Sequence, residues 1–215
     1  MNRIVQTKDN SCTLYSDTFK EHYHSTNGAL TESSHIFIKN GLYAVNKQKI
    51  NILEIGFGTG LNAVLTHLEA NRRGINVMYH GIDLYPPEKA ELKAYYESFD
   101  EPVCSAGVAM MQNPWNQTHN CGDHFSLKKI KADFTGFDFT AKYDIIYFDA
   151  FSPEVQPEAW DYKMFAKMYQ HMKPSGILVT FSVKGKVKNA LRKTGFEIEI
   201  LPGPPGKRHI LRAKA

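Results

Sequence analysis

The sequence contains few cysteines and no long apolar run. Its 215 residues include 3 cysteines, Cys12, Cys104 and Cys121, and none belongs to a C-x-x-C pair. This pattern argues against a disulfide scaffold or a zinc ribbon, so we expect isolated core thiols. Nearly apolar stretches such as Gly176 to Phe181 are far shorter than the roughly 20 residues of a membrane-spanning helix. The polar N-terminus lacks a signal-peptide core, so we expect a cytoplasmic protein without membrane association.

The sequence also lacks internal repeats, low-complexity tracts and any Gly/Ser/Pro-rich linker long enough to separate two domains. Its 42% hydrophobic and 22% charged residues are ordinary for a globular protein, which excludes wholesale disorder. We therefore expect one domain over residues 1–215.

From residue 49 onward, short β-rich runs alternate with helical patterns, which is typical of a sheet with helices on both faces. Seven strands are expected, at Lys49–Gly56, Asn76–Leu84, Phe125–Ala132, Tyr143–Asp149, Gly176–Val183, Glu197–Leu201 and Arg208–Ala213. Helices are expected at Leu61–Arg73, Pro87–Ser98, Pro157–Met172 and Lys184–Thr194, with a short turn after Phe134. Residues 99–123 read as a long insertion, and residues 1–46 as a small β-rich cap on a core at 47–215.

The last two expected strands are joined by Pro202-Gly203-Pro204-Pro205-Gly206. This link is too short for a crossover helix, so the two strands should pair antiparallel. A mostly parallel sheet that ends in an antiparallel hairpin resembles the methyltransferase version of the dinucleotide-binding fold. We therefore predict a Rossmann-like α/β fold of the class I methyltransferase kind.

A glycine-rich run, EIGFGTGLN at 54–62, joins the first expected core strand to its helix. A dinucleotide fingerprint would place its third glycine at position 61, but Leu61 stands there and Gly60 comes one residue early. The resulting G-x-G-x-G spacing, with an acid two residues before it, resembles an S-adenosylmethionine (AdoMet) loop. A merely tight turn is the alternative. The candidate AdoMet residues of this run are Glu54, Gly56, Phe57, Gly58, Gly60 and Asn62.

Two further acids end the next two strands. Asp83 is placed to accept hydrogen bonds from the ribose hydroxyls of a nucleoside, and Asp133 from an adenine amino group. Each acid alone could equally cap a helix. Together with Glu54 they should surround one crevice at the carboxyl ends of the strands, so we predict AdoMet there.

The fourth strand runs into DAFSP at 149–153. This places the Asp149 carboxylate at the sheet edge, with Phe151 shaping the wall beside it. Methyl transfer to an amine moves positive charge onto nitrogen, which a fixed carboxylate stabilises. We predict that Asp149 first orients the amine and stabilises this charge, and only second accepts a proton; a capping aspartate is the alternative.

Longer strings of residues resemble one family. These are YHSTNGALTESSHIF (23–37), GFGTGLNA (56–63), DAFSP with QPEAW (149–160), LVTFSVKGKVKNALRKTGF (178–196) and PGPPGKRHILRA (202–213). They are similar to the MnmC methyltransferase-domain family, whose stand-alone members are called MnmD. The resemblance implies N-methylation of 5-aminomethyl-2-thiouridine at the tRNA wobble position, giving 5-methylaminomethyl-2-thiouridine. Bifunctional members add a flavin-dependent oxidase domain, which we expect this chain to lack.

Basic residues are concentrated near the C-terminus. Residues 173–215 hold 10 Lys and Arg against 2 acids, whereas residues 1–172 hold 16 against 20. Such a stretch either is a solvated surface or binds a polyanion. Given the resemblance, we expect a tRNA anticodon stem-loop there, contacted by Lys184, Lys207 and Arg208.

Other readings of the sequence stay open. An aminopropyltransferase similar to spermidine synthase, or a catalytically silent RNA-binding module, would share this fold. His22 and His24 bracket Tyr23, but a metal site is not expected because no further ligand lies at a suitable spacing. Glu32 reads as an exposed loop residue, although it could help to bind an amine. The sequence does not indicate an oligomeric state.

Overall fold

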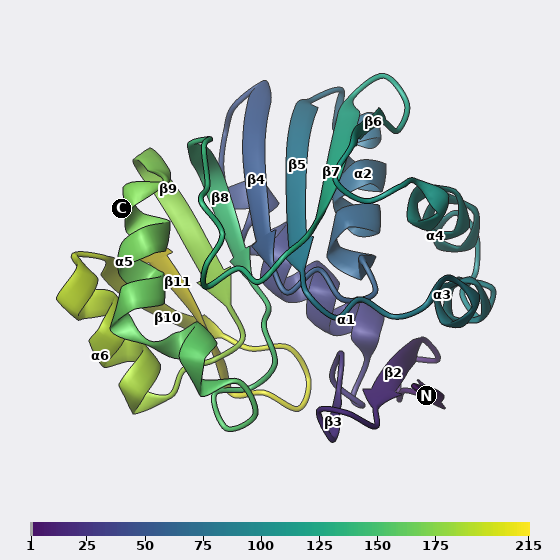
Figure 1. Ribbon diagram of the computed structural model, residues 1–215, viewed down its shortest axis with the longest axis horizontal. Helices are drawn as coiled ribbons and strands as arrows, with labels where there is room; N and C mark the ends of the chain where they lie inside the picture. Colours follow the sequence, from purple (N-terminus) through teal and green to yellow (C-terminus); the bar gives the residue numbers. More distant parts are fainter. Residues whose placement is uncertain (1) are drawn as a thin grey trace.

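An eight-stranded mixed sheet forms the centre of the computed structural model, which describes residues 2–215 (Figure 1). Its strands are β4 (Lys49–Ile55), β5 (Asn76–Asp83), β6 (Thr118–Asn120), β7 (Phe125–Lys131), β8 (Tyr143–Phe148), β9 (Met172–Thr180), β10 (Glu197–Pro202) and β11 (His209–Lys214). Their order is β10-β11-β9-β8-β4-β5-β7-β6. The five central strands β9, β8, β4, β5 and β7 are parallel, and the outer pairings are antiparallel. The C-terminal hairpin is therefore confirmed.

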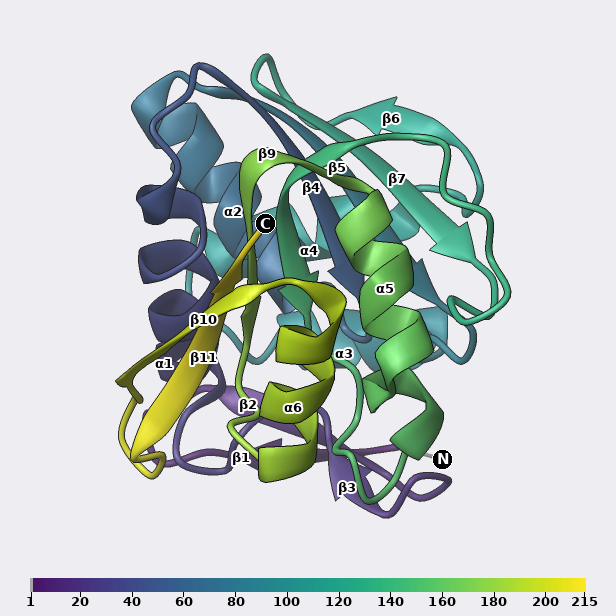
Figure 2. The ribbon, with the colours of Figure 1, turned by 90° about the vertical axis from the view of Figure 1, so that its left-hand side faces the viewer.

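Helices cover both faces of this sheet, as Figure 2 shows from the side. One face carries α2 (Leu61–Arg73), α3 (Lys89–Tyr96) and α4 (Val103–Gln112), and the other carries α5 (Tyr162–Gln170) and α6 (Gly185–Thr194). Successive strand residues point to opposite faces. In β4, Ile52 belongs to the core under α2, whereas Leu53 belongs to the core under α5. The central strands are buried on both sides for this reason.

The segment 99–123 differs from the insertion that we expected. It contains α4 and the edge strand β6, which gives the sheet one strand more than predicted. Gly107 of α4 lies against the ring of Tyr96 in α3. The sequence of α4, VCSAGVAMMQ, has no clear apolar stripe, so tertiary packing and not local periodicity sets this helix.

Smaller differences concern element ends. The expected helix at Pro157–Met172 is a 3₁₀ turn, η3 (Pro157–Trp160), followed by α5. Asp161 separates the two because its side chain accepts a hydrogen bond from the Met164 N–H at 2.8 Å, an N-cap. Strand β9 also begins at Met172, four residues before the predicted start at Gly176.

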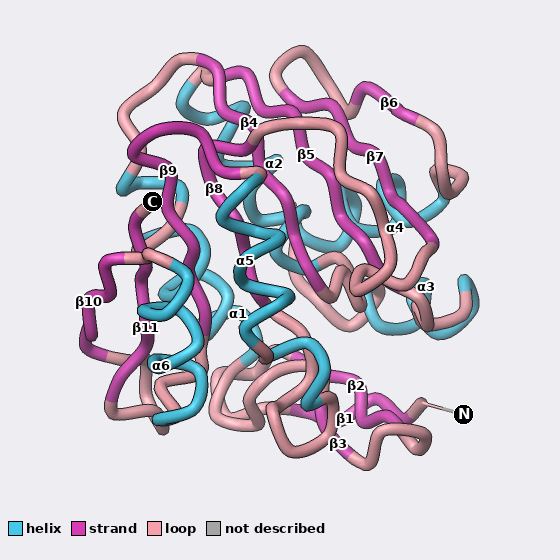
Figure 3. Tube along the Cα trace, turned by 60° about the vertical axis from the view of Figure 1, so that its left-hand side comes forward, coloured by secondary structure: helices cyan, strands magenta, loops and turns pink. Residues whose placement is uncertain are grey.

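The N-terminal cap is only partly β. Its strands β1 (Arg3–Gln6), β2 (Cys12–Ser16) and β3 (Glu21–His22) form a separate small sheet, and α1 (Ala29–Ser33), the π-helix η1 (Ser34–Lys39) and the 3₁₀ turn η2 (Leu42–Ala44) follow. Figure 3 shows the small sheet near the carboxyl ends of the core strands. Cys12 in β2 is buried, but Cys104 and Cys121 are only half-buried.

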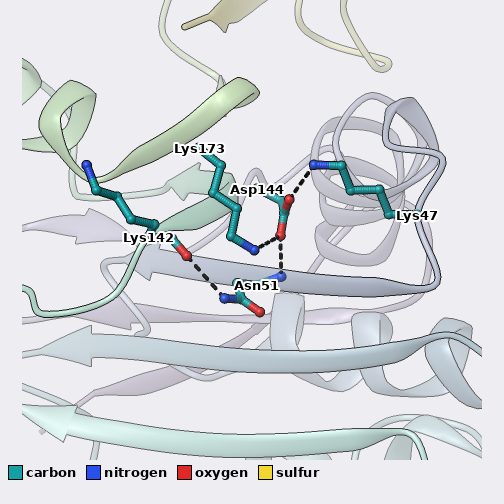
Figure 4. Close-up of polar contacts among 5 residues, drawn as sticks. All are labelled: Lys47, Asn51, Lys142, Asp144 and Lys173. Atoms are coloured by element: carbon teal, nitrogen blue, oxygen red, sulfur yellow. Dashed lines mark hydrogen bonds and ion pairs between the residues drawn. The ribbon is translucent and has the colours of Figure 1, made fainter.

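The amino end of the sheet is tied together by one buried acid. Asp144 at the start of β8 accepts hydrogen bonds from Lys47 Nζ and Lys173 Nζ, both at 2.7 Å, and from the Asn51 N–H at 2.8 Å (Figure 4). Burial opposes its ionisation, but these bonds hold the pKa of Asp144 below its usual range. This cluster joins β4, β8 and β9 at the end opposite the candidate site. Within residues 2–215, no helix is both long and apolar enough to cross a membrane.

Candidate active site

A cavity of about 430 Å³ lies at the carboxyl ends of β4, β5, β7 and β8, beneath the cap. Open α/β sheets bind ligands at this edge. From the core it is lined by the glycine loop and by the segments after β5, β7 and β8. Those loops bring together the following predicted residues: Gly56, Phe57, Gly58, Asn62, Asp83, Asp133, Asp149 and Phe151. The turn between β10 and β11 adds Lys207. The cap adds residues that the sequence did not assign, Phe19, His22, Tyr23, His24 and Glu32 among them.

The glycine loop needs glycine at two positions, because a side chain there would strain the backbone or collide with neighbouring atoms. Gly56 and Gly58 have φ values of 83° and 50°, a region that favours glycine. A Cβ on Gly56 would lie 2.6 Å from the Asp149 carbonyl oxygen, and one on Gly58 would lie 2.9 Å from the Tyr23 ring. The glycines therefore allow the loop to lie directly against the DAFSP segment and the cap.

Asp83 and Asp133 both line the cavity, as predicted, but they differ in their surroundings. Asp83 accepts hydrogen bonds from the Gly58 and Tyr85 N–H groups, each at 2.8 Å. Burial raises the pKa of Asp83, and these bonds oppose the rise. Asp133 is exposed and accepts a hydrogen bond from the Thr135 N–H at 2.8 Å. One acid thus braces the glycine loop from inside, and the other stands at the cavity rim.

Glu54 lies behind the cavity wall and does not line the cavity. Of the three acids that we expected around the crevice, only Asp83 and Asp133 line it. Its two carboxylate oxygens accept hydrogen bonds from Tyr79 Oη at 2.7 Å and Asn62 Nδ2 at 2.8 Å. Burial raises the pKa of Glu54 to about 8. Gly60 is also absent from the lining, because it packs against Met111 and Phe57. Glu54 therefore acts on the cavity from behind, through its hydrogen bond to Asn62 and through its charge.

Asp149 is a half-buried carboxylate of the cavity. Asn62 Nδ2, which also contacts Glu54, donates to Asp149 Oδ2 at 2.8 Å. Burial raises the pKa of Asp149 well above its ordinary value, and Glu54 and Glu32 raise it further, while the Asn62 hydrogen bond lowers it. A carboxylate with a raised pKa is a better proton acceptor than an ordinary aspartate. The environment therefore strengthens the proton-accepting role that we ranked second.

Aromatic rings form the wall beside Asp149. Phe151 stacks on Phe19 of the cap, with ring centroids 4.4 Å apart, and meets the Tyr23 ring edge-on at 5.1 Å. Phe19 is also 5.9 Å from the exposed ring of Tyr85. The sequence predicted Phe151 but not Phe19, because the cap's position over the sheet is set by tertiary contacts.

Glu32 and Lys207 meet inside the cavity. Glu32 is 8% exposed, so its expected place in an exposed loop is wrong. Its Oε1 lies 3.1 Å from Lys207 Nζ. Lys207, which we expected at a phosphate, also places Nζ 4.7 Å from the centre of the Phe181 ring, a cation–π contact. No local pattern pairs these two residues, which lie near opposite ends of the chain.

A second, open groove adjoins the cavity. It includes Lys184, Arg208 and His209, and it shares Phe181 and Lys207 with the cavity. Lys184 forms an ion pair with Glu154, so part of its charge is already balanced. The basic residues that we predicted for RNA thus lie in a groove that adjoins the cavity, and only Lys207 also lines the cavity.

The two predicted histidines have different environments. Both line the cavity, but His22 is half-buried, whereas His24 is buried, and burial lowers the pKa of His24 to about 4. Over residues 2–215, no group of three or more His, Cys, Asp and Glu side chains is placed to hold a metal ion.

Comparison with known proteins agrees with this geometry. Residues 115–215 match a family described as S-adenosyl-L-methionine-dependent methyltransferase. The tRNA 5-methylaminomethyl-2-thiouridine biosynthesis bifunctional protein MnmC of Azoarcus sp. strain BH72 is 29% identical over 217 residues, which cover 94% of this chain and 34% of the relative. The protein of the same name from Leptospira interrogans serovar Lai is 30% identical and covers 95% and 34%. The chain thus spans about a third of the length of these curated relatives.

Solved structures are similar as well. The crystal structure of MNMC2 from Aquifex aeolicus superposes with a TM-score of 0.80 and 25% identity, over 99% of this chain and 70% of that one. A putative class I S-adenosylmethionine-dependent methyltransferase from Listeria monocytogenes has a TM-score of 0.52 at 16% identity, over 88% and 62% of the two chains. The second similarity concerns the fold alone.

Proposed function

We propose that the chain is an AdoMet-dependent methyltransferase of the MnmC type, which N-methylates 5-aminomethyl-2-thiouridine at the tRNA wobble position; the similarity to methyltransferases of this kind supports the proposal. The observation that carries the proposal is Asp149, a half-buried carboxylate beside a glycine loop in an aromatic-walled cavity. We also propose that it acts in the cytoplasm on the anticodon stem-loop.

The residues of the cavity fit AdoMet. Gly56 and Gly58 leave the backbone bare where a Cβ would collide with neighbouring atoms. Asp83 lines the same cavity, and the rim acid Asp133 has one carboxylate oxygen, Oδ2, outside its bonds to Thr135. In our proposal Asp83 holds the ribose and Asp133 the adenine amino group. When bound, AdoMet supplies an electrophilic methyl group on a positively charged sulfur.

Asp149 serves the other reactant. An alkylammonium, with a pKa near 10.4 in water for lysine, must lose a proton before its nitrogen can attack. The raised pKa of Asp149 suits it to accept that proton. With AdoMet held by the glycine loop, the neutral amine would be the nucleophile toward its methyl group, and Asp149 would hold the proton that the amine has given up. The product is a secondary ammonium, whose charge the nearby acids stabilise.

The groove next to the cavity supports an RNA substrate. Arg208 and Lys184 line this groove, where they can neutralise phosphates of a stem-loop. A wobble base must leave its stack to reach Asp149, and the aromatic wall of Phe151 and Phe19 offers a new stacking partner.

Incubation of the purified protein with AdoMet and aminomethyl-thiouridine tRNA tests the proposal. Nucleoside mass spectrometry should find one added methyl group on that nucleoside and none on tRNA whose wobble uridine lacks the amine. Transfer of an aminopropyl group to a free polyamine would favour the aminopropyltransferase alternative. Failure to bind AdoMet would leave only the silent RNA-binding module.

A further inference from the structure

The pair formed by Glu32 and Lys207 has no part in the chemistry assigned to Asp149. Both side chains line the cavity, and both come from segments outside the parallel core: α1 of the cap and the turn between β10 and β11. We propose that Glu32 binds the ammonium group of the substrate, and that Lys207 occupies this position until the substrate displaces it. The inference rests on the proposed function and adds a second acid to its amine site.

Glu32 has the features of an ion-binding group. Its Oε2 accepts a hydrogen bond from the Ser25 N–H at 2.7 Å, which fixes the carboxylate. Its Oε1 is buried and accepts no hydrogen bond within residues 2–215, although Lys207 Nζ lies 3.1 Å away. A buried carboxylate oxygen without hydrogen bonds is costly, so this atom is suited to a better donor than the lysine.

The Lys207 ammonium occupies the position at which we expect the ammonium group of the substrate to bind. Its Nζ lies between the Glu32 carboxylate and the face of the Phe181 ring. Carboxylates and aromatic faces are the two kinds of group that recognise ammonium ions in water-poor sites. Glu32 and Lys207 both influence the charge of Asp149, in opposite directions, so the pair and the reacting carboxylate share one electrostatic environment.

The charges near Glu32 favour replacement of Lys207 by the substrate ammonium over binding of both cations together. Without ligands, the Glu32 carboxylate is paired with one cation, Lys207. A substrate ammonium that bound Glu32 while Lys207 stayed in place would put two cations beside one carboxylate, and their mutual repulsion is unfavourable. Lys207 also lines the neighbouring groove, and its side chain is 30% exposed. It can therefore turn outward, where an RNA phosphate replaces Glu32 as its partner.

The experiment compares two RNA stem-loops that differ only at the wobble base, one with 5-aminomethyl-2-thiouridine and one with uridine. The measured quantity is the ratio of their dissociation constants. Glu32→Gln should reduce the preference for the amine about tenfold, because a charged hydrogen bond is lost. Lys207→Met should increase the preference several-fold while it weakens binding of the uridine loop, since no internal cation competes and one phosphate contact is missing. Lys184→Met, the matched control, should weaken both loops equally.

The results separate this inference from the proposed function. If the wild-type protein transfers no methyl group to the aminomethyl loop, the proposed function is wrong, and this inference with it. If it does transfer one, but Lys207→Met leaves the preference unchanged or lowers it, then Lys207 is only a structural tie between the cap and the hairpin. Lys207→Met decides the question alone should Glu32→Gln not fold.

Discussion

Asn62 Nδ2 lies 2.8 Å from Asp149 Oδ2 and 2.8 Å from Glu54 Oε1, so a single amide group donates to two buried acids. Asn62 is the second residue of α2, directly after the glycine loop. The loop that we assign to AdoMet is therefore linked by one side chain to the carboxylate that we assign to the amine.

Replacement of Asn62 by alanine should show whether its amide contributes to stability alone or also to catalysis. Two buried acceptor atoms would lose their donor, which costs about 1–3 kcal/mol of unfolding free energy. We expect a lower kcat as well, because Asp149 loses the group that orients it. Thermal unfolding and steady-state kinetics measure both effects. Normal kcat in a destabilised Asn62→Ala protein would show that the amide serves only stability.

Asp149→Asn should lower kcat by roughly 10²–10⁴, the usual loss for a general base, and leave AdoMet affinity near normal. Single-turnover methyl transfer and calorimetric AdoMet binding are the measurements. Glu158→Gln, at another acid of the cavity lining, is the control and should retain the rate. Equal losses of rate and AdoMet affinity in Asp149→Asn would mean that this carboxylate binds the cofactor.

Glu54 should make stability depend on pH. Its pKa rises from 4.5 to about 8 on folding, so between these values the folded state binds more protons than the unfolded state. The contribution of Glu54 to the unfolding free energy should therefore be complete below pH 4.5. It should fall as the pH rises toward 8, by at most about 1.4 kcal/mol per pH unit. Denaturant titrations of the ligand-free protein should show a smaller decline for Glu54→Gln. An identical pH dependence in both proteins would contradict a raised pKa for this buried carboxyl.

Gly58→Ala should weaken AdoMet binding by more than tenfold. The added methyl group meets the Tyr23 ring at 2.9 Å in a backbone conformation of φ 50°, so the loop must shift. Gly185→Ala is the control, because a Cβ there meets nothing within 4 Å and its φ is not positive. Isothermal titration of both variants measures the difference, and similar AdoMet affinities would remove the loop from the binding site.

Arg208→Ala should weaken tRNA binding and reduce the dependence of its logarithm on salt by about 0.7–0.9, the value of one phosphate contact. Lys49→Ala serves as the control, since Lys49 begins β4 at the opposite end of the sheet. Binding is measured at several salt concentrations. An unchanged slope for Arg208→Ala would exclude this residue from the RNA surface.

Much of the fold followed from local patterns. The helical pattern correctly predicted both ends of α2. The short Pro-Gly link correctly predicted the hairpin of β10 and β11. In contrast, α4 carries small and apolar residues without a stripe, so its helical state depends on packing, such as that of Gly107 on Tyr96. Local propensity is weak evidence where burial decides.

The sequence by itself determined where the site lies. Parallel strands end at one edge, so a glycine loop and three successive strand-end acids had to gather there. Only the tertiary structure decided what each group faces: Glu54 turns into the core, Asp149 into the cavity, and Glu32 of the cap meets Lys207 of the last hairpin. Contacts between distant segments leave no periodic signal, because they depend on how whole elements pack and not on spacing along the chain.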